Sequence, residues 1–190
     1  MEQQILSGLM ARGIPEHVAR GMVANMMVES RLNPGINEIA PVVPGSRGGY
    51  GLNQWTGPRR VQYEAFAAQR GAPLDDMNTQ LDFTLWELQN SEKAAGSAIM
   101  GAPDAATAAR LYSERFLRPG VPNIEARMAA LGGIGPAGGP APQQPQNALL
   151  PQGQPQQQQP RNAFVLQPNQ LDPQAFMTSR RYNYLPLGNA

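Results

Sequence analysis

The chain has 190 residues, a formal net charge of +1 and no cysteine. This length accommodates one domain of ordinary size with an appendage, and the near-zero charge excludes a large basic surface that would collect nucleic acid or an anionic membrane without specificity. The absence of cysteine excludes disulfides, thiolate metal sites and cysteine nucleophiles.

The first two thirds of the chain alternate helical patterns with turn signals and contain no convincing β-hairpin. Pro15 is favoured in the first turn of a helix, and Asp75 or Asp76, together with Asp104, are expected helix caps. This part predicts an all-α domain over residues 1–131, with helices over residues 4–12, 15–30, 58–70, 73–95, 104–117 and 124–131.

A long loop, residues 31–51, follows the second predicted helix and is rich in glycine and proline. Connections in compact domains are usually much shorter, and long ones are often functional. We therefore expect this loop to contribute to a site.

The composition changes at Gly132. Residues 132–160 are rich in Gly, Pro and Gln and carry too little apolar surface to offset the conformational entropy of folding, so they are expected to be a linker. Residues 161–190 add spaced apolar anchors such as Phe164 and Tyr184. We expect this extended Pro/Gln-rich tail to become ordered only on the surface of another protein.

Targeting and metal-binding signals are weak. Glu2 stands where a signal peptide would carry positive charge, and no run approaches the ~18 apolar residues of a membrane span, so neither feature is expected. One histidine, His17, cannot build the usual zinc site of an amidase or peptidase without cysteine, and its place in a helix's opening turn favours a solvated or capping role. No metal or other cofactor is expected.

The stretch "MMVESRLNP" places the carboxylate of Glu29 at the end of an apolar helix. At 100° per residue Glu29 shares about a quarter of the helix circumference with Val18, Met22, Asn25 and Met26, which is the apolar face. Burial disfavours the charged form of a carboxylate, and a general acid at neutral pH needs to keep its proton. The alternative is a helix-end residue paired with Arg31 or another neighbour.

The stretch "GGYGLNQWTG", residues 48–57, combines glycines with amide and aromatic side chains. Glycine allows close approach of the backbone to a ligand, Asn53 and Gln54 supply paired donors and acceptors, and Trp55 supplies a flat apolar face. The combination suits a sugar. Its alternative is a glycine-rich turn beside a core tryptophan.

"VESRLNP" followed by "GYGLNQW" resembles the Glu-Ser and Gly-Leu-x-Gln motifs of the lysozyme and lytic transglycosylase superfamily. The resemblance is closer to the phage tail lysozyme family of virion-associated peptidoglycan hydrolases, because "TQLDFTLWELQ" and "LYSERFLRP" follow in the family's order. It covers about residues 5–131 and implies a lysozyme-like helical domain.

The resemblance implies a role for each matching residue. Glu29 would be the general acid that protonates the glycosidic oxygen, and Ser30 would help to shape the site. Tyr112 would face Glu29 across a cleft, although a core aromatic at helical spacing is at least as well supported. The remaining implied residues line a saccharide groove (Gly51, Leu52, Asn53 and Gln54) or stack on sugar rings (Tyr50 and Trp55).

A second catalytic carboxylate is not identified by the sequence. A hydrolase normally has two acids, about 5 to 5.5 Å apart for retention of configuration and about 6.5 to 9.5 Å for inversion. Lytic transglycosylases, which this pattern also resembles, use one Glu together with the substrate's own acetamido and hydroxyl groups. Hydrolysis and transglycosylation both stay open, with candidate second acids at Glu38, Asp75, Asp76 and Asp82.

The function implied is cleavage of the MurNAc–GlcNAc bond of peptidoglycan by a virion protein, in the host cell wall or periplasm, during phage genome entry. Residues 133–190 would dock onto other tail, portal or ejection proteins, in several copies of a symmetric particle, with no specific nucleic acid partner. The main rival is a non-catalytic structural virion protein that retains the lysozyme fold. A weaker rival is an endolysin for host lysis.

Overall fold

A computed structural model describes residues 1–41, 43 and 45–135. The expected tail at 161–190 and most of the expected linker lie outside these residues. The described chain forms α1 (Glu2–Ala11), α2 (Glu16–Ser30), α3 (Gly57–Gln69), α4 (Met77–Gln89), α5 (Lys93–Met100), α6 (Ala105–Leu111), the π-helical segment η1 (Tyr112–Leu117) and α7 (Ile124–Gly133).

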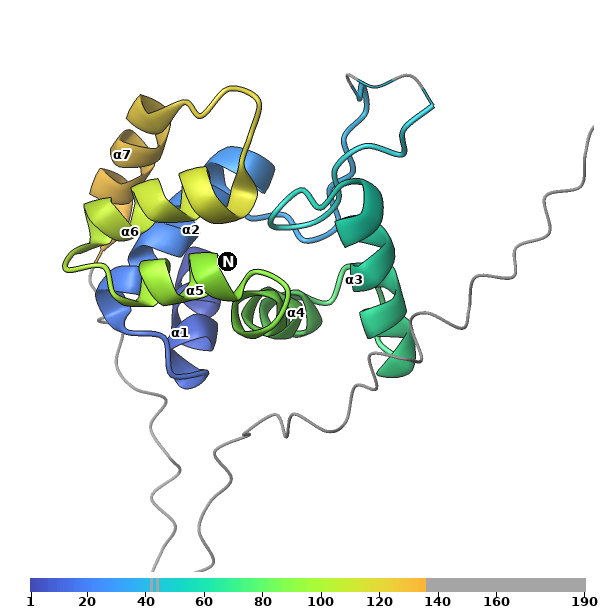
Figure 1. Cartoon of the computed structure of the whole chain (residues 1–190), viewed down its shortest axis with the longest axis horizontal. Helices are drawn as coiled ribbons and strands as arrows, with labels where there is room; N and C mark the ends of the chain where they lie inside the picture. The colour runs from blue at the N-terminus through green and yellow to red at the C-terminus, as the bar shows by residue number, and fades with distance from the viewer. Residues whose placement is uncertain (42, 44, 136–190) are drawn as a thin grey trace, which may run out of the picture. The chain divides into compact units, whose positions relative to one another are not determined.

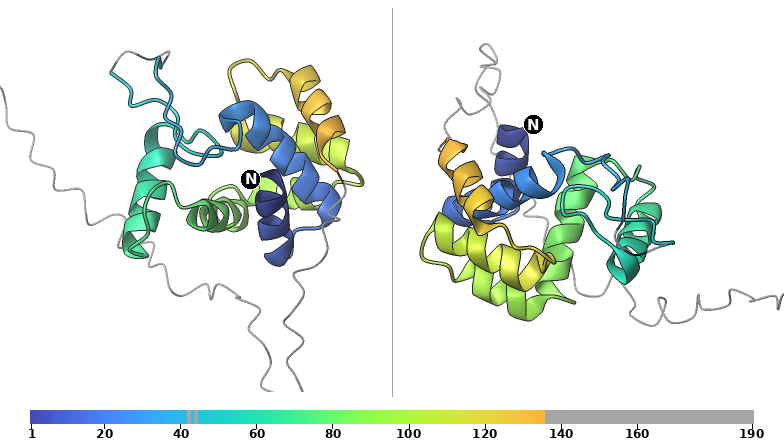
Figure 2. Two further views of the ribbon diagram at one scale, coloured as in Figure 1. Left: turned by 180° about the vertical axis from the view of Figure 1, so that it is seen from behind. Right: turned by 90° about the horizontal axis from the view of Figure 1, so that it is seen from above.

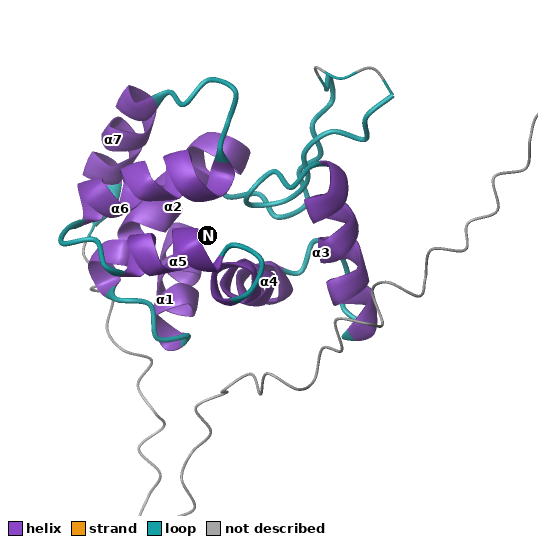
Figure 3. Cartoon of the chain, viewed as in Figure 1, coloured by secondary structure: helices purple, strands orange, loops and turns teal. Residues whose placement is uncertain are grey.

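The prediction of an all-α domain is confirmed for the described part of the chain (Figure 3). Within it, β pairing is confined to two isolated bridges, Asn37 with Tyr50 and Tyr50 with Trp55, which fold the 31–56 connection back on itself. Of the helices described, none has the length and apolar character needed to cross a bilayer.

Two of the expected capping residues do cap helices. The Asp76 carboxylate accepts the Thr79 N–H at 2.7 Å at the start of α4, and the Asp104 carboxylate accepts the Thr107 N–H at 2.7 Å at the start of α6. Each carboxylate satisfies a backbone donor that has no partner within its helix. Of the Asp75 and Asp76 alternatives, Asp76 is therefore the cap.

The prediction of one long helix over residues 73–95 is wrong, because the chain breaks between α4 and α5. The Asn90 side chain donates to the Trp86 carbonyl at 2.8 Å, and the Glu92 N–H turns back to the Glu87 carbonyl. Asparagine competes in this way with the helical hydrogen bonds. The break lets α5 pack closely on α4, since a Cβ at Gly96 would lie only 2.0 Å from the Leu88 carbonyl oxygen.

The helix expected over 104–117 is present but widens after α6. In η1 the Arg118 N–H donates to the Ser113 carbonyl, five residues earlier, at 2.8 Å. Arg118 then ends the segment in the left-handed conformation, with φ of 52°. Single π turns of this kind occur often at functional sites.

Helix α2 lies at the centre of one group of helices and contacts α1, α6 and α7. Figures 1 and 2 show α4 between this group and α3, which packs on α4 together with the 31–56 connection. The approach of α2 to α6 depends on Gly21, where a Cβ would lie 2.7 Å from the Ala109 nitrogen. The end of α2 therefore lies between firmly packed helices.

The described fold continues beyond residue 131. Helix α7 runs to Gly133, and the side chain of Ile134 is buried in the same core as α2. The Arg20 guanidinium donates to the Ile134 carbonyl at 2.8 Å. Ile134 is thus part of the helical domain.

Candidate functional site

The last turn of α2 carries Glu29, whose side chain is 17% exposed. Ser30 is buried, and its hydroxyl donates to the Met26 carbonyl of the same helix at 2.8 Å. Arg31 and Leu32 follow with φ of 53° and 59°. Two consecutive left-handed non-glycine residues are uncommon, and such residues cluster at functional sites.

The partner of Glu29 is Arg127 of α7, where the sequence alternative was pairing with Arg31 or another neighbour. Arg127 is 1% exposed, and its Nη2 lies 2.7 Å from Glu29 Oε1. Its Nη1 donates to Asn25 Oδ1 at 2.8 Å and its Nε to the Pro122 carbonyl at 2.7 Å. Each of its three nitrogens is therefore bonded.

Asn25 supports the same arrangement from one turn earlier in α2. Its amide nitrogen donates to the carbonyls of Gly21 at 2.8 Å and of Ala109 in α6 at 2.9 Å. These bonds fix the amide so that its oxygen faces Arg127. Glu29 is thus connected through Arg127 and Asn25 to both α6 and α7.

The "GYGLNQW" segment lies against α4 through Gln80. Gln80 Oε1 accepts the Leu52 N–H at 2.8 Å, and its amide nitrogen donates to the carbonyls of Pro34 and Leu74. Gly51 is buried with φ of 71°, and a Cβ there would lie 2.6 Å from the Gln80 amide. A larger residue at position 51 would therefore collide with the Gln80 side chain.

Asn53 and Tyr112 are buried and bonded to each other. The Tyr112 hydroxyl donates to Asn53 Oδ1 at 2.9 Å, and Asn53 Nδ2 donates to the Thr84 hydroxyl at 2.8 Å. Burial, and then the charges of Glu87 and Glu29, raise the pKa of Tyr112 well above its ordinary value. Tyr112 therefore interacts electrostatically with Glu29. Its ring is buried in the hydrophobic core, as the alternative interpretation of the sequence had it.

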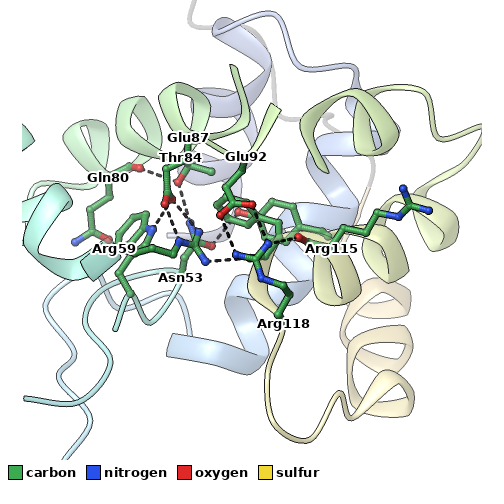
Figure 4. Close-up of polar contacts among 11 residues, drawn as sticks. Asn53, Arg59, Gln80, Thr84, Glu87, Glu92, Arg115 and Arg118 are labelled. Carbon is green, nitrogen blue, oxygen red and sulfur yellow. Dashed lines mark hydrogen bonds and ion pairs between the residues drawn. The ribbon is translucent and has the colours of Figure 1, made fainter. Parts of the chain in front are cut away.

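Trp55 is a core residue, since its ring is 1% exposed and stacks on Tyr63 at a centroid distance of 4.8 Å. Its indole N–H donates to Glu87 Oε2 at 2.7 Å, and Arg59 binds both Glu87 oxygens at 2.7 and 2.9 Å (Figure 4). A buried ring cannot stack on a sugar. Trp55 is therefore the core tryptophan beside a glycine-rich turn that the sequence analysis gave as the alternative.

The four sequence motifs thus meet in one buried polar network. Pro34 belongs to the first motif and Leu52, Asn53 and Trp55 belong to the second. Their partners lie in α4 and η1, within the third and fourth motifs. Figure 4 also shows a separate, partly exposed ion pair at 2.8 Å, between Glu92 in the turn after α4 and Arg118 at the end of η1. Most motif residues therefore hold the 31–56 connection against the helices.

Tyr50 and Gln54 are the members of the second motif with partly exposed side chains. Gln54 has φ of 50°, and its amide nitrogen donates to the Gly51 carbonyl at 2.9 Å. The Tyr50 ring lies under the Arg60 guanidinium at 5.1 Å, and burial, followed by the nearby Asp75 charge, raises its pKa. These two side chains can reach a ligand in solvent.

The candidate second carboxylates differ in their surroundings. Asp76 caps α4, and Asp82 is paired with Arg12 of α1 at 2.6 Å. Asp75 is exposed near Tyr50, and Glu38 Oε2 accepts the Gly49 N–H at 2.9 Å. Only Glu38 and Asp75 therefore lie beside the second motif.

No group of three or more potential metal ligands occurs among residues 1–41, 43 and 45–135. His17 is partly buried, and its Nε2 lies 2.9 Å from the Ala102 carbonyl oxygen, which is a structural contact. The arrangement around Glu29 is instead suited to proton transfer by a carboxyl group.

Asn25 and Arg127 hold Glu29 and lie outside the four motifs, and Glu87 lies in the motif "TQLDFTLWELQ" but was given no role by the sequence analysis. Asn25 was visible on the helical face of Glu29, and Arg127 stands within the largely apolar stretch "IEARMAAL". An arginine on an apolar helix face signals a buried acceptor or carboxylate. Its partner, 98 positions away, is a matter of tertiary structure.

A family model described as phage tail lysozyme matches residues 1–130. Morphogenesis protein 1 of Bacillus phage B103 is 38% identical over 91 residues, which are 48% of this chain and 24% of that protein. The chain thus spans about a quarter of the length of this curated relative. The family match covers well over half of the sequence and includes α2, the four motifs and Arg127, and the chain therefore belongs to the phage tail lysozyme family.

Proposed function

We propose that the chain cleaves the MurNAc–GlcNAc glycosidic bond of peptidoglycan, with Glu29 as the general acid. The observation that carries this proposal is the state of Glu29 at the end of α2, where it is paired yet still 17% exposed in a chain of a lysozyme family. A general acid needs a fixed position and access to the leaving oxygen, and Glu29 has both.

The chemistry proposed is protonation of the glycosidic oxygen by the Glu29 carboxyl as the C–O bond breaks and positive charge develops on the sugar ring. Tyr50 and Gln54 are the proposed contacts to the glycan, because their side chains are partly exposed. The other implied residues act indirectly. Gly51, Leu52, Asn53, Trp55 and Tyr112 hold the connection on which those contacts lie, and Ser30 is bonded within α2 beside Glu29.

The second step distinguishes a lysozyme from a lytic transglycosylase. In hydrolysis, Glu38 or Asp75 directs a water molecule to the sugar, and the products carry reducing ends. In transglycosylation, a hydroxyl of the substrate attacks instead and leaves 1,6-anhydro ends. Mass spectrometry of the released muropeptides separates these outcomes.

The test of the acid is Glu29→Gln assayed on purified sacculi. We expect activity to fall by about two to four orders of magnitude, the range for one general acid. Glu92→Gln is the matched control, because it removes the charge from another carboxylate–arginine pair outside the proposed site. Wild-type turnover in Glu29→Gln would overturn the assignment.

A structural role in the particle is the second candidate, and the name of the relative, morphogenesis protein 1, favours it. A structural protein of this family would retain the motif network and lose cleavage. If the wild-type chain is inactive on sacculi from its host while folded, this second candidate replaces the first.

The proposed setting is the virion, with action in the host cell wall during genome entry. The proposed organisation is a cleaving domain at the N-terminal side, a linker at 132–160 and a docking tail at 161–190. Removal of the tail is expected to leave sacculus cleavage intact and to abolish incorporation into particles. Normal incorporation of the shortened chain would show that the tail is dispensable for docking.

A further inference from the structure

We infer that Arg127 is a positioning residue that fixes one oxygen of Glu29 and leaves the other to carry the proton. This inference rests on the proposed role of Glu29 and adds a residue from the last helix of the domain. The observation behind it is that Arg127 binds only one of the two carboxyl oxygens of Glu29.

Glu29 Oε1 accepts from Arg127 Nη2 at 2.7 Å. For Oε2, no hydrogen bond is found within the part of the chain that the structure describes, although the side chain is partly exposed. A carboxyl group that is bound through one oxygen has little freedom to rotate, so Oε2 keeps a constant direction. Oε2 is therefore the oxygen that delivers the proton.

Arg127 is itself held more firmly than a surface arginine. Its other nitrogens bind Asn25 Oδ1 and the Pro122 carbonyl, and its side chain is almost completely buried. The planar guanidinium presents its donors in a fixed fork, so these two bonds determine where Nη2 points. A lysine at this position would supply the charge without that fork.

The experiment compares Arg127→Met and Arg127→Lys with wild type on soluble peptidoglycan fragments. We expect kcat to fall about 100-fold in Arg127→Met and about tenfold in Arg127→Lys with little change in KM, since small misplacements of a reacting group have effects of this size. Arg118→Met and Arg118→Lys are the controls, because Arg118 pairs with a carboxylate outside the site.

All variants are assayed well below their unfolding temperatures and corrected for the folded fraction. If Arg127→Met does not fold, Arg127→Lys decides by its kcat. A kcat equal to that of wild type, with only a lower unfolding temperature, would overturn the inference while the proposed function stands. An inactive wild-type chain, or an active Glu29→Gln, would instead overturn the proposed function itself.

Discussion

Glu87 and Glu29 are two of the carboxylates that bind an arginine in this domain, and their surroundings differ. Glu87 of α4 is completely buried, and both of its oxygens are bonded, to Arg59 and to the Trp55 indole. Glu29 of α2 is partly exposed and uses one oxygen for Arg127. Glu87 joins the second motif to α4, whereas Glu29 keeps an oxygen available for a ligand.

This comparison separates two reasons for placing an acid within a folded domain. A carboxylate whose lone pairs are all used by protein donors is a structural link, and its removal leaves those donors without partners. A partly exposed carboxylate with one oxygen that no protein donor binds stabilises the domain less. That oxygen stays available to accept or donate a proton. The family motifs contain residues of both kinds, so membership of a motif does not by itself indicate contact with substrate.

The largest expected effect on stability comes from Glu87→Gln. The substitution leaves the buried side of Arg59 without a counter-charge and weakens the Trp55 hydrogen bond, and breaking a buried ion pair costs about 3–5 kcal/mol. Glu29→Gln should cost less, about 1–2 kcal/mol, although Arg127 is buried, because glutamine retains an acceptor for Arg127 and its other nitrogens stay bonded to Asn25 and Pro122. Denaturant unfolding of both variants measures the difference.

Equal losses in these two variants would contradict the distinction drawn between the carboxylates. The expected losses of activity rank the two variants in the opposite order, because Glu87→Gln should cleave peptidoglycan whenever it is folded. Glu29→Gln should be folded and inactive.

The next effect concerns the end of the domain that lies against α2. A chain ending at Gly132 lacks Ile134, whose buried side chain is worth about 1.5–3 kcal/mol, and it also lacks the acceptor for Arg20. A chain ending at Gly135 retains both. We expect the longer form to unfold at a higher temperature in calorimetry, and identical unfolding temperatures would show that Ile134 contributes nothing.

Much of the fold was predictable from local signals. Asp104 and the proline before α2 mark helix starts by backbone chemistry that acts within a few residues, and both were read correctly. The break after α4 was missed because Asn90 fits the polar face of a continuous helix in the sequence. The break depends on the close packing of α5 on α4, which the sequence pattern does not contain.

The candidate site was predictable only in part. The position of Glu29 on an apolar helix face indicated an acid with a function, because burying a charged group costs free energy unless the group is paired. The partner Arg127 and the burial of Trp55 depend on contacts between elements far apart in the chain. Sequence patterns gave the residue types of a sugar site, and packing decided which of them are exposed.

Tyr112→Phe tests the motif network without changing a charge. The substitution removes the hydroxyl that donates to Asn53 Oδ1 and leaves a buried acceptor without that partner, at a cost of about 1–2 kcal/mol. If Tyr112 acts through the position of Asn53, the variant retains most of its activity. A loss of activity as large as that of Glu29→Gln, in a folded protein, would instead give the phenol a direct role in the reaction.

The smallest expected effect concerns the partly exposed ion pair of Glu92 with Arg118. The hydrogen bond from Arg118 is the largest influence and lowers the pKa of Glu92 from its ordinary 4.5. Since the folded pKa is the lower one, the unfolded chain binds more protons between the two values, so the stabilisation is present above about pH 4.5 and is lost as the pH falls through the folded pKa. We expect Glu92→Gln to cost about 0.5–1 kcal/mol at pH 7, as partly exposed pairs do, and the difference from wild type to shrink toward zero in acid. Unfolding free energies measured from pH 7 to pH 3 test this, and a difference that stays constant with pH would mean that the pair contributes through packing rather than charge.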